Sequence, residues 1–176
     1  KESAFLTNIF NRLARSCFYG AANVCGAHLP QVAPHAEVVE ACRRATLEFE
    51  RLAHGFDAHG ALAVAEELCR QENKRWDDSS KAAKGDDAAY EQALADAFCA
   101  LRTVTLLMHP AVPSGCEKIC EHMGLGAEDF FSWKHAFDGP VELAATLGQT
   151  PVEHAIVPLP PRFDFFEKHP SQVKKK

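Results

Sequence analysis

The sequence lacks the features that define several large classes of protein. No uninterrupted apolar run approaches the ~20 residues of a membrane-spanning helix, so an integral membrane protein is excluded. Positive charge is not in excess, because 19 Lys and Arg residues stand against 24 Asp and Glu residues and leave a net charge of −5. This balance argues against a cationic coat for nucleic acid but allows a local basic face. The 176 residues, 47% hydrophobic and 24% charged, exclude wholesale disorder and fit one ordinary globular domain.

The sequence also lacks the short motifs of common catalytic sites. His-Glu-x-x-His, the phosphate-cradling glycine loop, the dinucleotide fingerprint and Gly-x-Ser-x-Gly are all absent. One local group has metal-ligand chemistry, namely Cys116, Cys120 and His122, but on a helix His122 is turned away from both cysteines. We expect these thiols to pack in the core. We therefore predict no metal and no cofactor in this chain, and keep a metal-dependent enzyme as an alternative.

The cysteine count indicates a reducing environment. Seven cysteines cannot all pair within one chain, and no secretory signal opens the sequence. We therefore expect reduced thiols and a cytoplasmic protein. The chain begins at Lys1 without an initiator methionine, and a helical pattern is under way by Phe5. This start is typical of a segment from a longer protein.

Glycine, proline and apolar spacing predict an all-α fold with an irregular C-terminal arm. The pattern predicts a helix bundle over residues 1–125, and contains neither an internal repeat nor an alternating strand. Short apolar pieces and prolines predict an extension over 126–170 that packs on the bundle or on a catalytic domain outside this chain. A flexible basic tail is expected over 171–176. About five helices are expected, at residues 3–19, 36–54, 57–83, 87–108 and 113–124.

The first helix is expected to have one apolar face and one polar face. Leu6, Phe10, Leu13 and Cys17 follow a 4-3-4 spacing, which places them on one stripe of a helix. This stripe should face the core. The residues predicted to be buried in the bundle are Leu6, Phe10, Leu13, Phe98, Leu101 and Ile119.

The polar face of the first helix carries the groups that recognise RNA loops. Asn8, Arg12, Arg15 and Tyr19 repeat the 4-3-4 spacing on the opposite side. An amide, two guanidinium groups and an aromatic ring can read and stack on unstacked bases, although an ordinary solvent-exposed face would look the same.

A second basic row follows the third predicted helix. It consists of Arg70, Lys74, Lys81 and Lys84, and Asp77 interrupts it. This row is compatible with a solvated face of mixed charge or with a phosphate-binding face.

The order of several motifs resembles the C-terminal domain of methionyl-tRNA synthetase. The stretch 6–12 looks like that family's Leu-x-Asn-x-x-x-Arg opening, and 69–78 is similar to its Ala-Asn-Lys-Tyr-Ile-Asp-Glu stretch. Residues 101–113 resemble its helix ending in a Pro-x-x-Pro turn, and 117–125 its helix ending in Leu-Gly. Gly148 and 158–164 look like its Gly…Leu-Phe-Pro-Arg-Ile-Asp tail.

The resemblance implies an anticodon-binding helix bundle whose partners are methionine tRNA and a catalytic domain of the same polypeptide. That catalytic domain would use ATP and methionine, and its motifs are absent here, so the chain itself should hold no catalytic residue. The family's anticodon contacts map onto Asn8 and Arg12. Possible contacts to the tRNA backbone are Arg15, Arg70, Lys74 and Lys81.

One position departs from the family. Where the family carries Pro-Trp with a stacking Trp, this chain has Lys81 and Ala82. We expect Trp76 to pack inside the bundle and Asn73 to make structural hydrogen bonds. Two alternatives stay open, namely the anticodon domain of a class I synthetase for Leu, Ile, Val or Cys, and a helical adaptor that has lost tRNA recognition.

Overall fold

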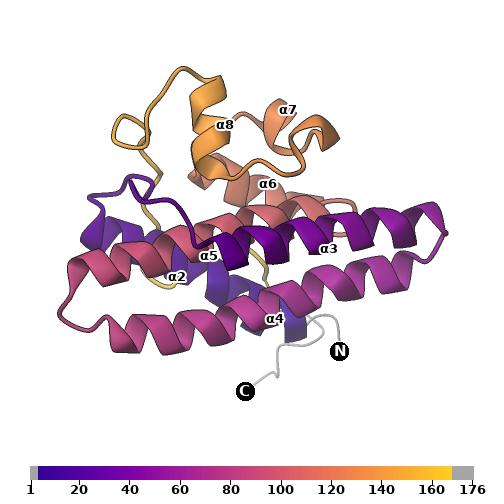
Figure 1. The fold of residues 1–176 in the computed structure, drawn as a ribbon, viewed down its shortest axis with the longest axis horizontal. Helices are drawn as coiled ribbons and strands as arrows, with labels where there is room; N and C mark the ends of the chain where they lie inside the picture. Colours follow the sequence, from indigo (N-terminus) through magenta and orange to yellow (C-terminus); the bar gives the residue numbers. More distant parts are fainter. Residues whose placement is uncertain (1–3, 168–176) are drawn as a thin grey trace.

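Three long helices run side by side through the molecule and form its frame (Figure 1). In the computed structural model, which describes residues 4–167, these are α3 (Ala36–His54), α4 (Ala58–Ala82) and α5 (Asp87–Met108). Each reverses direction relative to the one before it, and α4 packs against both α3 and α5. The described residues contain no strand, so the predicted all-α bundle is confirmed.

Acidic caps define where two of these helices begin. The Asp57 carboxylate accepts a hydrogen bond from the Gly60 N–H at 2.8 Å, and Asp86 accepts one from the Ala89 N–H at 3.0 Å. Each bond satisfies one of the backbone donors that the first turn of a helix leaves free. All three long helices begin within one residue of the predicted starts at residues 36, 57 and 87.

The central helix is α5, because its sides are covered by the other elements. All residues from Ala93 to Met108 are buried, including Arg102. Five of the six residues predicted for the core are indeed buried, namely Phe10, Leu13, Phe98, Leu101 and Ile119. A helix that is apolar on nearly all sides is expected at the centre of a bundle.

The first helix is wider in its opening turn than predicted. It consists of a π-helical turn, η1 (Phe5–Phe10), followed by α2 (Asn11–Val24). The wide turn brings Phe5 and Phe10, five residues apart, onto the buried face. The prediction that Leu6 is buried is therefore wrong, since the π turn leaves it half-buried beside the core.

The region after α6 (Pro113–His122) is more ordered than the irregular extension predicted. It contains α7 (Ala127–Phe130), the 3-10 turn η2 (Trp133–His135) and α8 (Pro140–Thr146). These short helices lie together with α6 on the side of the bundle away from α4 (Figure 1). These helices were not predicted, because pieces of three to seven residues are too short to show a helical period.

Arg102 attaches this region to the central helix. Its side chain is fully buried, and its guanidinium donates hydrogen bonds to the carbonyl oxygens of Phe130, His135 and Ala136, at 3.1, 2.8 and 3.3 Å. Burial lowers the pKa of Arg102 to about 10. A cation in the core thus supplies hydrogen-bond donors to three backbone carbonyls of this segment, of which that of His135 also accepts from the Asp138 N–H.

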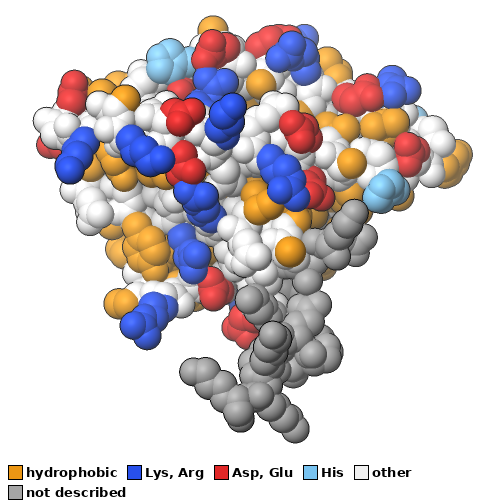
Figure 2. Space-filling model, turned by 90° about the horizontal axis from the view of Figure 1, so that it is seen from below, with side chains coloured by type: hydrophobic (Ala, Val, Ile, Leu, Met, Phe, Trp, Pro, Cys, Tyr) orange, Lys and Arg blue, Asp and Glu red, His pale blue; other side chains and the backbone are white. Residues whose placement is uncertain are grey.

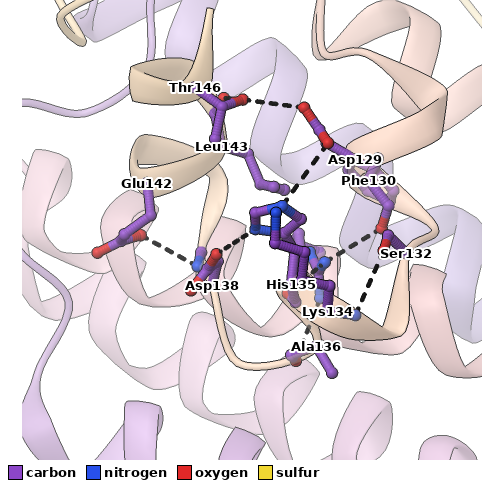
Figure 3. A network of polar contacts seen from close by, with 12 residues as sticks. Asp129, Phe130, Ser132, Lys134, His135, Ala136, Asp138, Glu142, Leu143 and Thr146 are labelled. Carbon is purple, nitrogen blue, oxygen red and sulfur yellow. Dashed lines mark hydrogen bonds and ion pairs between the residues drawn. The ribbon is translucent and has the colours of Figure 1, made fainter.

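A polar network connects the three short helices to one another (Figure 3). The His135 ring contacts the Asp138 carboxylate at 2.6 Å and the Asp129 carboxylate at 3.6 Å. Asp129 in turn accepts a hydrogen bond from the Thr146 hydroxyl at 3.2 Å. The network ties α7, η2 and α8 into one layer.

The chain then returns as an extended arm to the first helix. Among the described residues, Ile156 donates a backbone hydrogen bond to Ala27 at 2.9 Å, and Phe165 and Phe166 are buried in the core. The Phe166 ring stacks on Phe10 with centroids 4.8 Å apart. The boundary at residue 125 stays a prediction, and the proposed tail at 171–176 lies outside the described residues. No described helix is long and apolar enough to cross a membrane.

Glycine at position 115 makes this docking possible. A Cβ placed there would lie 2.0 Å from Cε1 of the Phe166 ring, well inside contact distance. The residue lies in the first turn of α6, where the ring rests directly on the helix backbone. The arm therefore depends on a residue without a side chain.

Candidate nucleic-acid interface

The polar residues predicted on the first helix are divided between η1, which holds Asn8, and α2, which holds Arg12, Arg15 and Tyr19. Asn8 and Arg12 are exposed, whereas Arg15 and Tyr19 are half-buried. The four are thus not equally available to a ligand. Asn8 makes only one side-chain contact in the described residues, a hydrogen bond at 3.5 Å from its neighbour Thr7.

Arg12 is held by an acidic residue of α4. Its Nη2 donates to the Asp77 carboxylate, and both side chains stay partly exposed. Asp77 is the residue that interrupts the predicted basic row, and no sequence pattern indicates that it faces Arg12. Because a guanidinium has five N–H donors, Arg12 keeps donors for a second partner.

Arg15 and Tyr19 contact the C-terminal arm instead. Arg15 donates to the Asp164 carboxylate at 2.8 Å, and the Tyr19 hydroxyl donates to the Pro160 carbonyl at 2.8 Å. The backbone N–H of Phe163 donates to the Tyr19 hydroxyl at 3.4 Å. The arm therefore forms one border of the polar face.

Asn11, which the sequence analysis did not select, fixes the arm at this place. It is buried, and its Oδ1 accepts from the backbone N–H groups of Phe165 and Phe166, each at 3.0 Å. Its Nδ2 donates to the Phe166 carbonyl at 2.8 Å. No local pattern points to such a role, since its partner Phe166 lies 155 residues away in the sequence.

The predicted basic row lies along α4. Arg70, Lys74 and Lys81 are exposed, and Arg70 forms an ion pair with Glu66 one turn earlier. Figure 2 looks at the side of the bundle that carries α4 and shows basic side chains scattered among acidic ones. This surface is of mixed charge and is not a continuous cationic patch.

A groove opens between α2, α4 and the start of α5. Its volume is about 500 Å³, and Trp76 and Tyr90 line it from the α4 and α5 sides. Trp76 is 7% exposed and meets the Tyr90 ring edge-on, with centroids 5.4 Å apart. The expectation that Trp76 packs in the bundle is confirmed. The residues lining the groove are Arg12, Arg15, Ser16, Tyr19, Gly20, Asn23, Trp76, Ser80 and Tyr90.

Two further positions of α4 were singled out in the sequence, namely Asn73 and the pair Lys81 and Ala82. Asn73 is buried and donates to the carbonyl oxygens of Ile9 and Cys69 at 3.1 and 3.0 Å, which confirms its structural role. Lys81 and Ala82, which stand where the resembling family has Pro-Trp, are both exposed. The aromatic residues that line the groove together with Arg12 are Tyr19, Trp76 and Tyr90.

The cysteines and His122 have packing roles. His122 lies among aromatic rings, with its centroid 5.0 Å from Phe163 and 5.5 Å from Phe165, and its Nδ1 contacts the Lys118 carbonyl at 2.9 Å. Burial raises the pKa of the Cys120 thiol to about 12, so it stays protonated. Over residues 4–167, no three His, Cys, Asp or Glu side chains form a group that could hold a metal ion.

One buried acidic residue lies behind the basic row. Glu72 is 4% exposed, and burial raises its pKa to about 8 despite the attraction of Arg75, whose Nε is 3.4 Å away. Asp96 is also buried and accepts hydrogen bonds from the backbone and ring of His35, at 2.7 and 2.8 Å. This cluster faces α3 and α5 and is separate from the groove.

Comparison with known proteins gives a likeness in structure only. No protein-family model matches the sequence, and a search of curated proteins gives no match. The crystal structure of Mycobacterium tuberculosis methionyl-tRNA synthetase bound by methionyl-adenylate has a TM-score of 0.69 to this chain at 21% identity, covering 91% of this chain and 31% of that one. The apo form of that enzyme gives a TM-score of 0.67 at 20% identity, covering 94% and 32%. The chain thus spans about a third of these structures and shares the fold of that part.

Proposed function

We propose that this chain is the anticodon-binding domain of a methionine–tRNA ligase, an aminoacyl-tRNA synthetase of the cytoplasm. The domain would position methionine tRNA for a catalytic domain of the same polypeptide, which uses ATP and methionine. The observation that carries the proposal is the likeness in fold to the Mycobacterium tuberculosis enzyme over 91% of this chain. The order of sequence motifs along the chain supports it independently.

The exposed polar groups on the first helix supply the chemistry. Asn8 offers an amide donor and acceptor, and Arg12 offers a planar fork of donors. Such groups can hydrogen-bond to the edge of an unstacked base. In this proposal Asn8 and Arg12 read the anticodon, while Arg15, Arg70, Lys74 and Lys81 attract the phosphates without reading sequence.

Two arginine variants test the proposal with two RNA hairpins, one carrying the methionine anticodon loop and one with a changed anticodon base. Arg12→Ala should weaken binding of the methionine hairpin by about 1–3 kcal/mol and reduce discrimination between the hairpins. Arg15→Ala should weaken both alike and lower the slope of log Kd against log salt by about 0.7.

Arg44→Ala, at an exposed position of α3, is the control and should change neither affinity nor discrimination. An unchanged discrimination ratio in Arg12→Ala, with an altered ratio in Arg15→Ala, would reverse the two roles. Equal hairpin affinities in the unmodified chain would reject the proposal.

A helical adaptor without tRNA recognition is the second candidate. Two observations favour it: Lys81 and Ala82 replace the family's Pro-Trp, and acidic residues already contact both Arg12 and Arg15. Full-length tRNAs for methionine, leucine, isoleucine, valine and cysteine separate the candidates. Preference for one of the last four would indicate a neighbouring class I synthetase, and no preference at all would indicate the adaptor.

A further inference from the structure

We infer that the groove between α2, α4 and α5 takes one unstacked base of a single-stranded RNA loop, with Tyr90 as its stacking surface. This inference rests on the proposed function and adds a second base contact beside Asn8 and Arg12. It gives the chain an aromatic platform in a different place from the tryptophan that Lys81 and Ala82 replace. The first argument is the composition of the groove, which combines three aromatic residues with two arginines.

The Tyr90 ring is held in place before any ligand arrives. Trp76 meets it edge-on at 5.4 Å, with an interplanar angle of 78°. The edge of the ring also lies near Gly20, where a Cβ would be 3.3 Å from Tyr90 Cε1 and 2.7 Å from Leu94 Cδ2. The absence of a side chain at Gly20 lets the ring lie close to α2. A half-buried ring fixed in this way loses little side-chain entropy when a base stacks on it.

The rim of the groove supplies groups for the rest of a nucleotide. Arg12 and Arg15 line it with guanidinium groups that are paired with Asp77 and Asp164 and keep further N–H donors, and Asn23 and Ser80 add neutral polar groups. Its volume of about 500 Å³ lies within the ordinary range for small-molecule sites. An aromatic floor with a cationic border suits a base joined to a phosphate, because stacking accepts any base while the arginines attract the backbone.

The amino-acid composition allows a direct test. The chain contains only two tyrosines, and both Tyr19 and Tyr90 line this groove. Protein labelled with 3-fluorotyrosine therefore gives fluorine resonances that report on the groove alone. Titration with the methionine-anticodon hairpin should shift the Tyr90 resonance. In a set of hairpins that each carry an abasic site at one loop position, the hairpin that lacks the stacked base should give a smaller shift than the others.

Binding measurements on matched variants complete the experiment. Tyr90→Leu should weaken hairpin binding about 5- to 150-fold, the loss expected for one base–aromatic stack. Tyr90→Phe keeps the ring and should bind as the unmodified chain does. Trp133→Leu removes an exposed aromatic residue on η2 and should leave binding unchanged. Thermal melting of each variant identifies any loss of folding, and the resonance shift in the unmodified chain tests the inference without a mutation.

The possible outcomes separate the inference from the proposed function. Weakened binding in Arg12→Ala with unchanged binding in Tyr90→Leu, and no shift of the Tyr90 resonance, would overturn the groove site and leave the proposed function standing. Failure of the unmodified chain to bind or respond to any hairpin would overturn both. A shift caused by an acidic peptide and by no RNA would assign the groove to a protein partner and also overturn the inference.

Discussion

Asn11 and Phe166 exchange hydrogen bonds between the first α-helix and the end of the C-terminal arm. The Asn11 Nδ2 donates to the Phe166 carbonyl at 2.8 Å, and the Phe166 N–H donates to Asn11 Oδ1 at 3.0 Å. Asn11 is 1% exposed, so water cannot replace these bonds in the folded chain. Its neighbour Arg12 belongs to the proposed RNA contact. The residue that fixes the arm and the residue proposed to read the RNA are thus adjacent on α2.

Asn11→Ala should release the arm. The substitution leaves the buried N–H groups of Phe165 and Phe166 without their acceptor, and each unsatisfied group costs about 1–3 kcal/mol. We expect a loss of about 2–4 kcal/mol in the free energy of unfolding, together with faster protease cleavage within residues 158–166. Asn8→Ala is the matched control and should change stability by less than about 0.5 kcal/mol, because Asn8 is exposed. Equal effects of the two variants would contradict the anchor.

Gly115→Ala should displace the Phe166 ring from α6. The new Cβ would overlap the ring, which is confined on its other side by Phe10. We expect a loss of about 1–3 kcal/mol in chemical denaturation, the usual cost of overpacking a core. Gly126→Ala is the comparison, since a Cβ there meets nothing within 4 Å, and its cost should stay below about 1 kcal/mol. A neutral Gly115→Ala would show that the arm does not rest on this helix.

Asp164→Asn should strengthen RNA binding without changing its specificity. The substitution removes the carboxylate that contacts Arg15 and leaves that guanidinium free to meet a phosphate. Affinity for the methionine hairpin and for the changed hairpin should rise by the same factor. The slope of log Kd against log salt should change by less than the ~0.7 of one whole phosphate contact on a single strand, because Arg15 already supplies that contact in the unmodified chain. Unequal changes for the two hairpins would assign Arg15 to base reading.

Glu72 should make the protein less stable as the pH rises. The folded pKa of about 8 exceeds the ordinary value of 4.5, so between these values the folded chain holds a proton that the unfolded chain has released. The free energy of unfolding should therefore fall from about pH 4.5 to about pH 8 and then level. Glu72→Gln removes the carboxyl group that titrates. The difference in the free energy of unfolding between this variant and the unmodified chain should therefore shift in favour of the variant by on the order of 2–4 kcal/mol from pH 5 to pH 9.

His35 provides the control for this pH dependence. The hydrogen bond and charge of Asp96 raise the His35 pKa above 6.5, so its contribution is also lost as the pH rises, but only from that value upward. The His35→Gln variant should retain the fall in stability between pH 5 and pH 6.5. If the fall in stability between pH 5 and pH 6.5 disappeared in His35→Gln and persisted in Glu72→Gln, the effect would belong to His35 and the prediction for Glu72 would be wrong.

The sequence predicted the long helices well because their signals are local. Asp57 and Asp86 cap α4 and α5, and the apolar period extends over many turns. Both the helices and the faces that they turn toward the core can therefore be predicted from the sequence. Leu6 was misplaced because the apolar spacing assumes an α-helical turn, and nothing in residues 5–10 indicates the π turn that the structure adopts. The short helices after Gly126 lack the length to establish a period.

The candidate site was only partly predictable for a different reason. Helical spacing places Asn8, Arg12, Arg15 and Tyr19 on one face, and in the structure the last three line one groove, whereas Asn8 lies in the π turn η1. Their partners come from elsewhere, however, since Asp77 belongs to α4 and Asp164 to the arm. Tyr90 was missed because its place in the groove depends on how α5 packs against α2. Such contacts depend on tertiary packing, which a helical wheel does not contain.

The docking of the arm on α2 has a consequence for how the chain is made. Asn11 and Phe166 are separated by 155 residues, so a ribosome adding about 5–20 residues per second needs about 8–30 s between them. Throughout that time the Phe10 ring lacks the cover that Phe166 later provides. The nascent bundle therefore carries an open apolar surface at Phe10, and the packing of η1 and α2 is completed only after the arm has been synthesised.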